Sequence, residues 1–275
     1  MEIGDIMIQV IASCQNKIIK HCKSLQTKKY RDSTNEFLIE GIKLLKEAIE
    51  SNVKLTALLY HNEAAKDRDV QSIIKMCMEK NIVIYELHEK PYMDISETKT
   101  PQGVIGIGKK IDYNVNKLLR SNRFNIIIME QVQDPGNVGT IIRTADAFGF
   151  DMVFLSKGCA DVYSGKVIRS TMGSIFHIPI ITDVSLESLL KKFIDLEVYT
   201  IAATPHTGLS CYDIEYGDRN AIIIGNESKG LSSNIMDMVK IKANIPMVGM
   251  AESLNAGIAA AIMMYEATRY KLKHR

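Results

Sequence analysis

No run of apolar residues in the chain approaches the length of about eighteen that a helix needs to span a bilayer. The first ten residues, MEIGDIMIQV, carry acidic side chains where a secretory signal needs basic ones. These two absences exclude a membrane-embedded or secreted protein. We therefore expect a cytoplasmic protein with no membrane partner.

Cysteine is sparse, and its spacing excludes the common cysteine sites. The five cysteines form no CxxC pair and no Cys/His cluster of metal-ligand spacing: Cys14, Cys22, Cys77, Cys159 and Cys211. This pattern predicts a reduced, metal-free protein.

Net charge is also small, because 34 Lys and Arg residues oppose 32 Asp and Glu residues and leave +2. An excess of this size does not indicate a nucleic-acid partner, so the location of charge has to carry that argument. The 275 residues are 46% hydrophobic and 24% charged, as in an ordinary globular chain, and their number predicts two domains.

The first part of the chain mixes helical and strand patterns. The apolar residues of EFLIEGIKLLKEAIES, residues 36–51, fall near helical spacing and predict a helix. A second helix is predicted over 70–80. Short apolar runs with β-branched residues predict strands at 53–60, 81–87 and 103–110.

A polar and charged stretch from Lys110 to Asn125 separates this part from the rest. Such stretches are typical of domain linkers. We expect a first domain at residues 1–110, a linker at 111–121 and a second domain at 122–275.

Apolar runs of the second part, FNIIIME, DMVFLS, HIPII, EVYTIAAT and NAIIIGN, alternate with helical stretches. This alternation predicts an α/β domain with a mostly parallel sheet. Ligands of such sheets bind at the carboxyl ends of the strands. Candidate site loops are therefore QDPGNVGT (133–140), GNESKGL (225–231) and IPMVGMAESLN (245–255).

The first loop leaves a strand through a Pro-Gly turn, and Asn137 is a candidate cap for the helix that follows. Arg143 lies in that helix among apolar residues, where a guanidinium cannot be buried without an anionic or dipolar partner. Two interpretations stay open, an arginine that faces a ligand and an exposed arginine whose aliphatic part packs sideways. Spacing alone favours the second.

In the second loop, Gly225 and Gly230 allow the backbone to approach a ligand closely. The loop lacks the Lys-Ser/Thr ending of a Walker A motif and the third glycine of GxGxxG. Glu227 is a candidate to accept hydrogen bonds from a ribose or to orient Arg143. Taken alone, a solvated acid in a turn is the better interpretation of Glu227.

The third loop precedes a long helix rich in small residues, GIAAAIMM, which suits close packing within a subunit or across a dimer. Ser253 is the predicted N-cap of this helix. Asn255, in the first turn, fits either hydrogen bonding at the helix end or contact with a ligand.

In this order and at these separations, the three loops closely resemble the motifs of the SpoU, or TrmH-type, branch of the SPOUT RNA methyltransferases. The resemblance covers residues 122–275. It extends more weakly to NEFLIEGIKLLKEAI and TKTPQGVIGI, which are similar to the first and last elements of an L30e-like substrate-binding domain. Residues 1 to 30 match nothing diagnostic. Two departures are Ser228, where many relatives have glycine, and AGIAAAI in place of the commoner VSVAAAI.

The resemblance implies a catalytic domain with a deep trefoil knot, preceded by a smaller α/β L30e-like domain. It also implies S-adenosylmethionine as cofactor and a homodimer as the assembly. The polar active-site residues that it implies are Asn137, Arg143, Glu227, Ser253 and Asn255. The implied cofactor-binding residues are Thr204, Gly225, Asn226, Ile245, Met247 and Leu254.

The reaction that the resemblance implies is methylation of a ribose 2′-hydroxyl in structured RNA, and we expect ribosomal RNA. Methylation of transfer RNA and a non-catalytic RNA-binding protein with a degenerate SPOUT domain are the alternatives. A dehydrogenase-type enzyme is disfavoured because the glycine fingerprint is missing. Arg143, which stays charged, is expected to hold the phosphate beside the target ribose and stabilise the alkoxide. The proton is expected to leave through that phosphate, Glu227 or water.

Between Asn16 and Arg31 the chain carries no acid and a local density of positive charge that the net charge conceals. The basic residues are Lys17, Lys20, Lys23, Lys28, Lys29 and Arg31. Such a run is usually a solvated helix face. Beside RNA methyltransferase motifs it predicts contact with RNA phosphates and binding that weakens with salt. Because no aromatic stacking platform is present, a folded RNA loop is expected rather than a long single strand.

Overall fold

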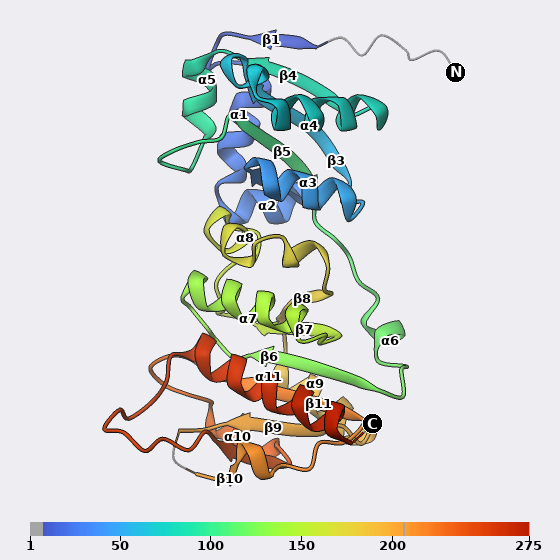
Figure 1. Cartoon of the computed structure of the whole chain (residues 1–275), viewed down its shortest axis with the longest axis vertical. Helices are drawn as coiled ribbons and strands as arrows, with labels where there is room; N and C mark the ends of the chain where they lie inside the picture. Colours follow the sequence, from blue (N-terminus) through green and yellow to red (C-terminus); the bar gives the residue numbers. More distant parts are fainter. Residues whose placement is uncertain (1–7, 206, 275) are drawn as a thin grey trace. The chain divides into compact units, whose positions relative to one another are not determined.

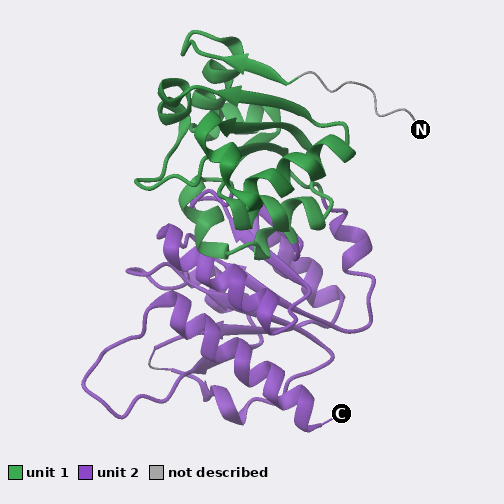
Figure 2. Cartoon of the chain, turned by 45° about the horizontal axis from the view of Figure 1, so that its top comes forward, with its two compact units in different colours: residues 1–112, 163–176 green, residues 113–162, 177–275 purple. Residues whose placement is uncertain are grey.

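The computed structural model describes residues 8–205 and 207–274, which form two compact units (Figure 2). The first unit comprises the chain up to Asp112 and the later segment Tyr163–Phe176. Tyr113–Val162 and the chain from His177 onward form the second unit. The expected division at 111–121 did not include the return of residues 163–176 to the first unit. Residues 1–7, on which the judgement about a secretory signal partly depended, lie outside the described residues.

A mixed five-stranded sheet in the order β1-β4-β3-β5-β2 forms the first unit (Figure 1). Its strands are β1 Gln9–Ile11, β2 Glu36–Glu40, β3 Leu55–His61, β4 Val83–Leu87 and β5 Val104–Lys109. β4 pairs in parallel with β1 and β3, whereas β5 is antiparallel to β2 and β3. The helical segments are α1 Lys17–Leu25, α2 Lys28–Thr34, α3 Ile42–Glu50, η1 Asn62–Lys66, α4 Arg68–Glu79, α5 Glu89–Ile95, α8 Gly165–Thr171 and η2 Ser174–Phe176.

The helix predicted over residues 36–51 is wrong in its first part, because Glu36–Glu40 forms the strand β2. Phe37 and Ile39 are both fully buried, which is the two-residue alternation of a strand. Gly41, with a φ of 113°, separates this strand from α3. The short apolar run of residues 36–40 fits the periodicity of a helix as well as that of a strand. Its pairing with β5 makes it a strand.

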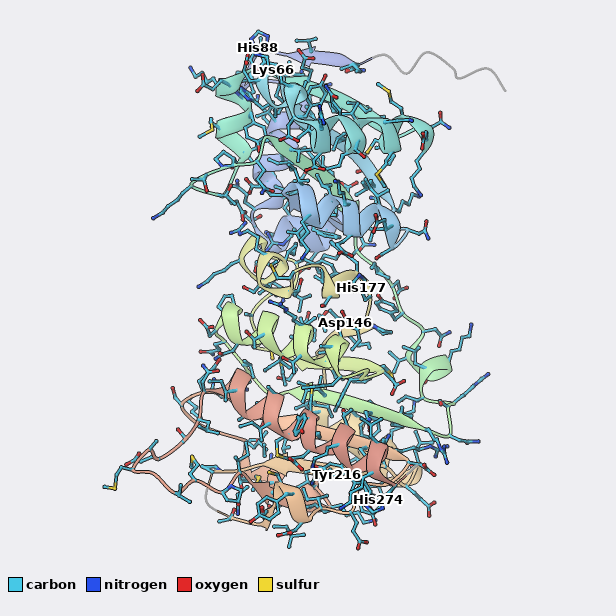
Figure 3. The ribbon with its side chains drawn as sticks, in the orientation of Figure 1. Lys66, His88, Asp146, His177, Tyr216 and His274 are labelled. Carbon is cyan, nitrogen blue, oxygen red and sulfur yellow. The ribbon has the colours of Figure 1, made fainter. Side chains whose placement is uncertain are left out.

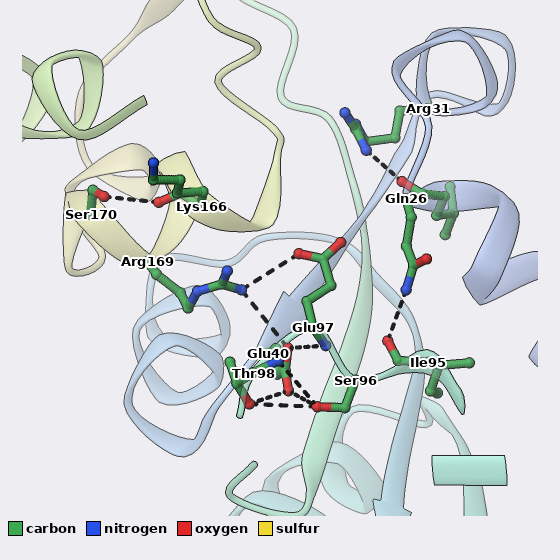
Figure 4. A network of polar contacts seen from close by, with 11 residues as sticks. Gln26, Arg31, Glu40, Ile95, Ser96, Glu97, Thr98, Lys166, Arg169 and Ser170 are labelled. Atoms are coloured by element: carbon green, nitrogen blue, oxygen red, sulfur yellow. Dashed lines mark hydrogen bonds and ion pairs between the residues drawn. The ribbon is translucent and has the colours of Figure 1, made fainter. Parts of the chain in front are cut away.

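Glu40 binds the returning segment to the rest of the first unit (Figure 4). Its carboxylate, on a side chain that is 7% exposed, accepts hydrogen bonds from the hydroxyls of Ser96 and Thr98 and from the N–H of Glu97. The Nη1 atom of Arg169, in α8, lies 3.5 Å from Glu97 Oε2 and 3.9 Å from Glu40 Oε2. One buried carboxylate therefore joins β2, the segment after α5 and α8.

The second unit contains seven strands, all paired in parallel, in the order β10-β12-β9-β11-β6-β7-β8. They are β6 Phe124–Met129, β7 Met152–Ser156, β8 Ile180–Val184, β9 Tyr199–Ala203, β10 Leu209–Ser210, β11 Arg219–Ile224 and β12 Ile241–Asn244. The helical segments are α6 Val115–Leu118, α7 Pro135–Ala147, α9 Leu186–Asp195, η3 Cys211–Asp213, α10 Ser233–Met238 and α11 Ala256–Lys273. The predicted α/β fold with a parallel sheet is confirmed.

Helices cover both faces of this sheet, so its central strands are apolar on both sides. Phe124 and Ile126 of β6 belong to a core cluster that includes Phe193 of α9. Ile127 and Met129, which are fully buried, point to the opposite face. There α11 packs against α7 and β11 (Figure 1).

Contacts near the C-terminal ends of α7 and α11 fix the far ends of these helices (Figure 3). Tyr270 of α11 lies against the rings of Tyr216 and His274, with centroids 5.6 Å and 4.4 Å apart. His177 Nδ1 lies 3.0 Å from Asp146 Oδ2, on α7. Both helices begin at the carboxyl edge of the sheet, so their first turns are available to a site at that edge.

The connection from β12 to α11 runs back across this edge. β12 lies on the far side of β9 from β11, yet α11 packs against α7 and β11. Residues 245–255 therefore cross the carboxyl ends of β9 and β11. The trefoil knot stays a prediction. In the described part of the chain, no helix is long and apolar enough to cross a membrane.

Candidate active site

The loops that follow β6, β11 and β12 all leave the carboxyl edge of the second sheet. In the parallel register, Met129 at the end of β6 lies opposite Ile224 at the end of β11. The chain continues from these strands to α7, α10 and α11, respectively. The three sequence motifs thus start from one edge, as the parallel arrangement predicted.

Glu227 joins the second loop to the first. Its Oε1 accepts hydrogen bonds from the N–H of Asp134 and from Nδ2 of Asn137, each at 3.0 Å. Its Oε2 accepts a hydrogen bond from the N–H of Gln133 at 3.1 Å. Both carboxylate oxygens are therefore bound to the loop after β6, and no hydrogen bond or ion pair among the described residues connects Glu227 to Arg143.

Asn255 adds the third loop to this arrangement. Its Nδ2 donates to Oδ1 of Asn137 at 2.8 Å. Its Oδ1 accepts from the N–H groups of Gly257 at 2.9 Å and Ile258 at 3.2 Å, so Asn255 is the N-cap of α11. The prediction that Ser253 is this cap is wrong, because α11 begins only at Ala256. We call the hydrogen-bonded set Asn255, Asn137 and Glu227 the three-loop network.

The start of α7 also differs from the prediction. Asp134, not Asn137, is the N-cap, and its Oδ1 accepts from the N–H of Asn137 at 2.9 Å. Pro135 occupies the first turn, where its missing N–H has no intrahelical partner to lose. Asn137, 8% exposed, is the third residue of the helix, and its side-chain amide bridges Asn255 and Glu227.

The pKa of Glu227 reflects this arrangement. Partial burial by itself raises the pKa, because it disfavours the charged form. The hydrogen bonds from Asn137 and from the backbone N–H groups of Asp134 and Gln133 outweigh burial and hold the pKa below its ordinary value. Glu227 is therefore ionised near neutral pH and is a weak proton acceptor.

Arg143 lies on α7, the helix that carries Asn137, and its side chain is exposed. Among residues 8–205 and 207–274, none forms an ion pair or a hydrogen bond with this guanidinium. Burial of the guanidinium against a protein partner is therefore not observed within these residues. The guanidinium is available to an anion from outside the chain.

The loop of residues 225–231 closes tightly on itself. The N–H of Asn226 donates to the carbonyl of Gly230 at 3.1 Å, and the reverse bond measures 2.9 Å. Asn226 Oδ1 also accepts from the N–H groups of Ser228 and Lys229. A Cβ on Gly225 would lie 2.3 Å from the carbonyl carbon of Gly230, so this closure requires glycine at 225. Ser228 is not among the residues with positive φ, and the loop accommodates a serine there.

The remaining predicted cofactor positions follow the strands β9 and β12. The N–H of Thr204 donates to the carbonyl of Ala243 at 2.8 Å, which ties the end of β9 to β12. Ile245 and Met247 are half-buried, and Leu254 is exposed. The backbone of residues 247–254 makes no hydrogen bond to any residue that the structure describes. Free backbone donors and acceptors beside apolar side chains fit a nucleoside, whose base has polar edges and apolar faces.

Sequence reasoning missed Glu130, Gln131 and Ser232. Glu130, 9% exposed, accepts from the N–H of Ser232 at 2.9 Å and from its Oγ at 2.7 Å. Gln131 has a φ of 52°, and its carbonyl accepts from Nδ2 of Asn226 at 2.8 Å. An acid at the end of an apolar strand was the available signal for Glu130. No sequence pattern indicates the backbone conformation of Gln131.

Most of the predicted RNA-binding lysines lie at the surface of α1 and α2. The exposed residues are Lys17, Lys20, Lys23, Lys28 and Lys29. Lys23 Nζ forms an ion pair with Asp94 Oδ1 at 2.6 Å. Within the described ranges, Lys17, Lys20 and Lys29 form no ion pair, and they are the lysines most available to an external phosphate.

The prediction that Arg31 contacts RNA is wrong. Arg31 is 5% exposed, and its Nη1 donates to the carbonyl of Leu25, at the end of α1, at 2.6 Å. Carbonyls at the C-terminal end of a helix lack intrahelical donors, and Arg31 satisfies one of them. Its role is to join α2 to α1.

No group of three or more His, Cys, Asp or Glu side chains within the described residues is arranged to hold a metal ion. The described cysteines are free thiols.

Comparison with known families matches both units of the chain. The sequence model of the SpoU rRNA Methylase family matches residues 125–265. The model of the MRM3-like substrate binding domain matches residues 16–106.

Individual proteins match over almost the whole chain. The 23S rRNA (guanosine(2553)-2′-O)-methyltransferase RlmP of Bacillus subtilis is 35% identical over 255 residues, which cover 93% of this chain and 97% of that protein. The 23S rRNA (uridine(2479)-2′-O)-methyltransferase of Streptomyces viridochromogenes is 26% identical over 89% of this chain and 86% of its own length. The crystal structure of the AdoMet-bound rRNA methyltransferase from Sinorhizobium meliloti has a TM-score of 0.82 at 30% identity, with 96% and 98% of the two chains covered.

Proposed function

Because the chain belongs to the SpoU rRNA Methylase family, we propose that it is an S-adenosylmethionine-dependent methyltransferase that modifies a ribose 2′-hydroxyl in ribosomal RNA. Two relatives that match along most of the chain are named as 23S rRNA 2′-O-methyltransferases. The similar Sinorhizobium structure contains AdoMet. These names support ribosomal RNA over transfer RNA as the substrate class.

The observation that carries the proposal is the three-loop network at the carboxyl edge of the parallel sheet. Asn255, Asn137 and Glu227 come from three separate sequence motifs, and hydrogen bonds of 2.8 Å and 3.0 Å join them. The same helix, α7, presents Arg143 without a partner among the described residues. Together these features favour a catalytic domain over a degenerate one.

We assign cofactor binding to the loops that surround this network. Residues 225–231 supply a closed backbone turn, and Ile245 and Met247 supply apolar surface beside free backbone groups. Thr204 and Leu254 border the same edge. When bound, the cofactor supplies an electrophilic methyl group on a sulfonium, so that the chain has only to align and deprotonate the acceptor.

Arg143 has the role of binding the RNA at the reaction centre. A guanidinium stays charged at neutral pH and matches a phosphate in two hydrogen bonds. Placed on the phosphate beside the target ribose, it also stabilises negative charge on the attacking oxygen. Glu227 is not the proton acceptor in this scheme, because both of its oxygens already accept hydrogen bonds that join the first and second loops. The proton leaves to the bound phosphate or to water.

The first unit has the role of binding RNA through Lys17, Lys20 and Lys29. We assign substrate binding to residues 1–110, the connection to 111–121 and methyl transfer to 122–275, of which residues 163–176 pack in the first unit. The match of residues 16–106 to a substrate-binding domain supports this division. Since ribosomal RNA is the substrate, we place the reaction in the cytoplasm.

A homodimer completes the proposal, with α11 as its contact surface. Ile258, Tyr265 and Leu272 are 53%, 50% and 65% exposed and recur every seven residues, so they form one apolar stripe along the helix. Such a stripe on a soluble chain indicates a protein partner. A second copy of the chain, with the same stripe, is the partner that fits.

The test is transfer of labelled methyl groups to unmodified ribosomal RNA, followed by mapping of the site. Methylation of a 2′-oxygen makes the adjacent phosphodiester resistant to alkali, so the expected result is one labelled, alkali-resistant position. Label on a base overturns the reaction class, and label only on transfer RNA overturns the substrate class.

A further inference from the structure

Glu130 is a buried carboxylate at the end of β6 that the proposed reaction does not use directly. Its side chain lies next to the site, because the next residues of the chain form the first motif loop. Both of its oxygens accept hydrogen bonds from Ser232, the residue that follows the second motif loop: Oε2 from the N–H and Oε1 from the hydroxyl. The contact thus spans the two loops at a point separate from Glu227.

The hydroxyl of Ser232 makes this contact in place of a helix-capping hydrogen bond. It stands at the N-cap of α10, where a serine oxygen ordinarily accepts a hydrogen bond from the first turn of the helix. No such bond is formed by Ser232, and its hydroxyl donates to Glu130 instead. The charge-assisted bond to a buried carboxylate is stronger than the cap that it replaces. Ser232 therefore fixes the end of the loop rather than the first turn of α10.

Gln131 connects this contact to the start of the same loop. Its positive φ of 52° is uncommon for a residue with a side chain and has to be held by its surroundings. Its N–H donates to Ser156 Oγ at 2.9 Å, and its carbonyl accepts from Asn226 Nδ2 at 2.8 Å. Asn226 in turn accepts from the N–H groups of Ser228 and Lys229 and so shapes the turn.

Glu130, Gln131, Asn226 and Ser232 therefore hold residues 225–232 at both ends, and we call them the clasp. We propose that Glu130 is a positioning residue for the cofactor, which acts through Ser232 to fix the loop of residues 225–232. This inference rests on the proposed function, because it takes that loop as the cofactor-binding loop. The clasp and the three-loop network then have different tasks. The clasp sets the shape of the cofactor loop, and the three-loop network joins that loop to the RNA-binding side.

The expected signature is a loss of cofactor affinity without a matching loss of RNA affinity. Glu130→Gln keeps the size of the side chain but removes its charge and one of its two acceptor oxygens, so it cannot accept from both the N–H and the hydroxyl of Ser232. Loss of a charge-assisted hydrogen bond in a buried place weakens S-adenosylmethionine binding by about tenfold or more. At saturating cofactor we expect kcat within about threefold of the wild-type value and an unchanged KM for RNA.

The experiment is calorimetric titration of the full chain with S-adenosylmethionine, together with KM and kcat for each substrate. Glu215→Gln is the matched control, because Glu215 is exposed in the same unit and has no ion pair or hydrogen bond to a described residue. Ser232→Ala removes only the hydroxyl donor and gives a second, milder variant. We expect the double variant to bind the cofactor as weakly as Glu130→Gln alone, because the two residues act through one contact.

Cofactor binding of both variants at the level of the control overturns the inference, as does an equal loss of RNA and cofactor affinity. Additive effects in the double variant also overturn it. If Glu130→Gln does not fold, the same outcomes apply to Ser232→Ala. A wild-type chain that does not bind S-adenosylmethionine contradicts the proposed function itself, which distinguishes the two failures.

Discussion

In each unit a carboxylate accepts hydrogen bonds from several donors, but Arg169 of the first unit and Arg143 of the second unit differ in their partners. In the first unit Glu40 is almost fully buried, and Arg169 lies within ion-pair distance of Glu40 and Glu97. In the second unit Glu227 is exposed and accepts three hydrogen bonds from neutral donors, and Arg143 has no partner among the described residues. The difference indicates that the first cluster serves stability and the second holds a cation ready for a ligand.

Removal of the Arg143 guanidinium tests the contrast between the two units most directly. Arg143→Ala is expected to lower turnover by about a hundredfold to a thousandfold or more, because the variant lacks the charge that stabilises the attacking oxygen. Its melting temperature and its affinity for S-adenosylmethionine are expected to stay close to wild type, because the guanidinium holds no other described part of the chain in place. Steady-state kinetics, calorimetry and thermal melts measure the three quantities.

Lys191→Ala is the control, since Lys191 is an exposed, unpaired cation within the described part of the same unit. Near-normal turnover of Arg143→Ala contradicts the role of Arg143. A large fall in its melting temperature makes Arg143 a stabilising residue like Arg169, and the contrast between the two units then disappears.

The buried carboxylate of the first unit should show the reverse behaviour. Glu40→Gln leaves some of the donors from Ser96, Glu97 and Thr98 without an acceptor and is expected to cost about 1.5–3 kcal/mol in free energy of unfolding. Urea denaturation measures this change, with the exposed Glu79→Gln as control. Because Glu40 contacts no motif residue, kcat should not change. Equal stability of the two variants contradicts the stabilising role of the Glu40 network.

Lys17, Lys20 and Lys29 sharpen the comparison further, because these exposed cations of the first unit form no ion pair with a described residue. Combined replacement of Lys17, Lys20 and Lys29 by alanine is expected to weaken RNA binding about tenfold at low salt. It should also reduce the salt slope by about 0.7–0.9 for each phosphate that the variant no longer neutralises. Filter binding across a salt series measures both. The triple variant should bind S-adenosylmethionine normally, and unchanged RNA affinity contradicts the assigned surface.

The smallest predicted effect concerns pH. Because hydrogen bonds lower the pKa of Glu227 in the folded chain, its contribution to stability is complete above the unfolded value of 4.5 and is lost as pH falls through the folded value. The contribution is at most about 1 kcal/mol, since the group is exposed. The difference in unfolding free energy between wild type and Glu227→Gln should be constant from pH 7 to 5 and shrink below pH 4.5. A difference that grows on acidification means that the pKa is raised.

The sequence predicted the parts of the fold that depend on local pattern. Alternating apolar runs and helices indicated the parallel sheet, and three motif loops indicated its functional edge. Of the five polar residues that the resemblance implied, hydrogen bonds connect Asn137, Glu227 and Asn255, whereas none within the described residues connects Arg143 or Ser253 to them. Their individual roles were less predictable: the caps belong to Asp134 and Asn255, because cap identity depends on the residue at which each helix begins.

What the sequence could not show depends on contacts between distant segments. Residues 36–40 carry apolar side chains that fit a helix or a strand, and only pairing with β5 decides. The return of residues 163–176 to the first unit depends on Arg169 and on the burial of Glu40. In the sequence, Arg31 looks no different from the neighbouring surface lysines, although its guanidinium is buried against the end of α1. The partnership of Glu130 with Ser232 joins segments far apart in the chain and has no local signature.

The most direct test of the central claim is a crystal structure of the chain with S-adenosylmethionine. We predict that the ligand lies between residues 225–231 and 245–255, with Glu227, Asn137 and Asn255 still joined and Arg143 exposed beside it. A ligand bound at another edge, or Asn137, Glu227 and Asn255 found apart from one another, contradicts the claim.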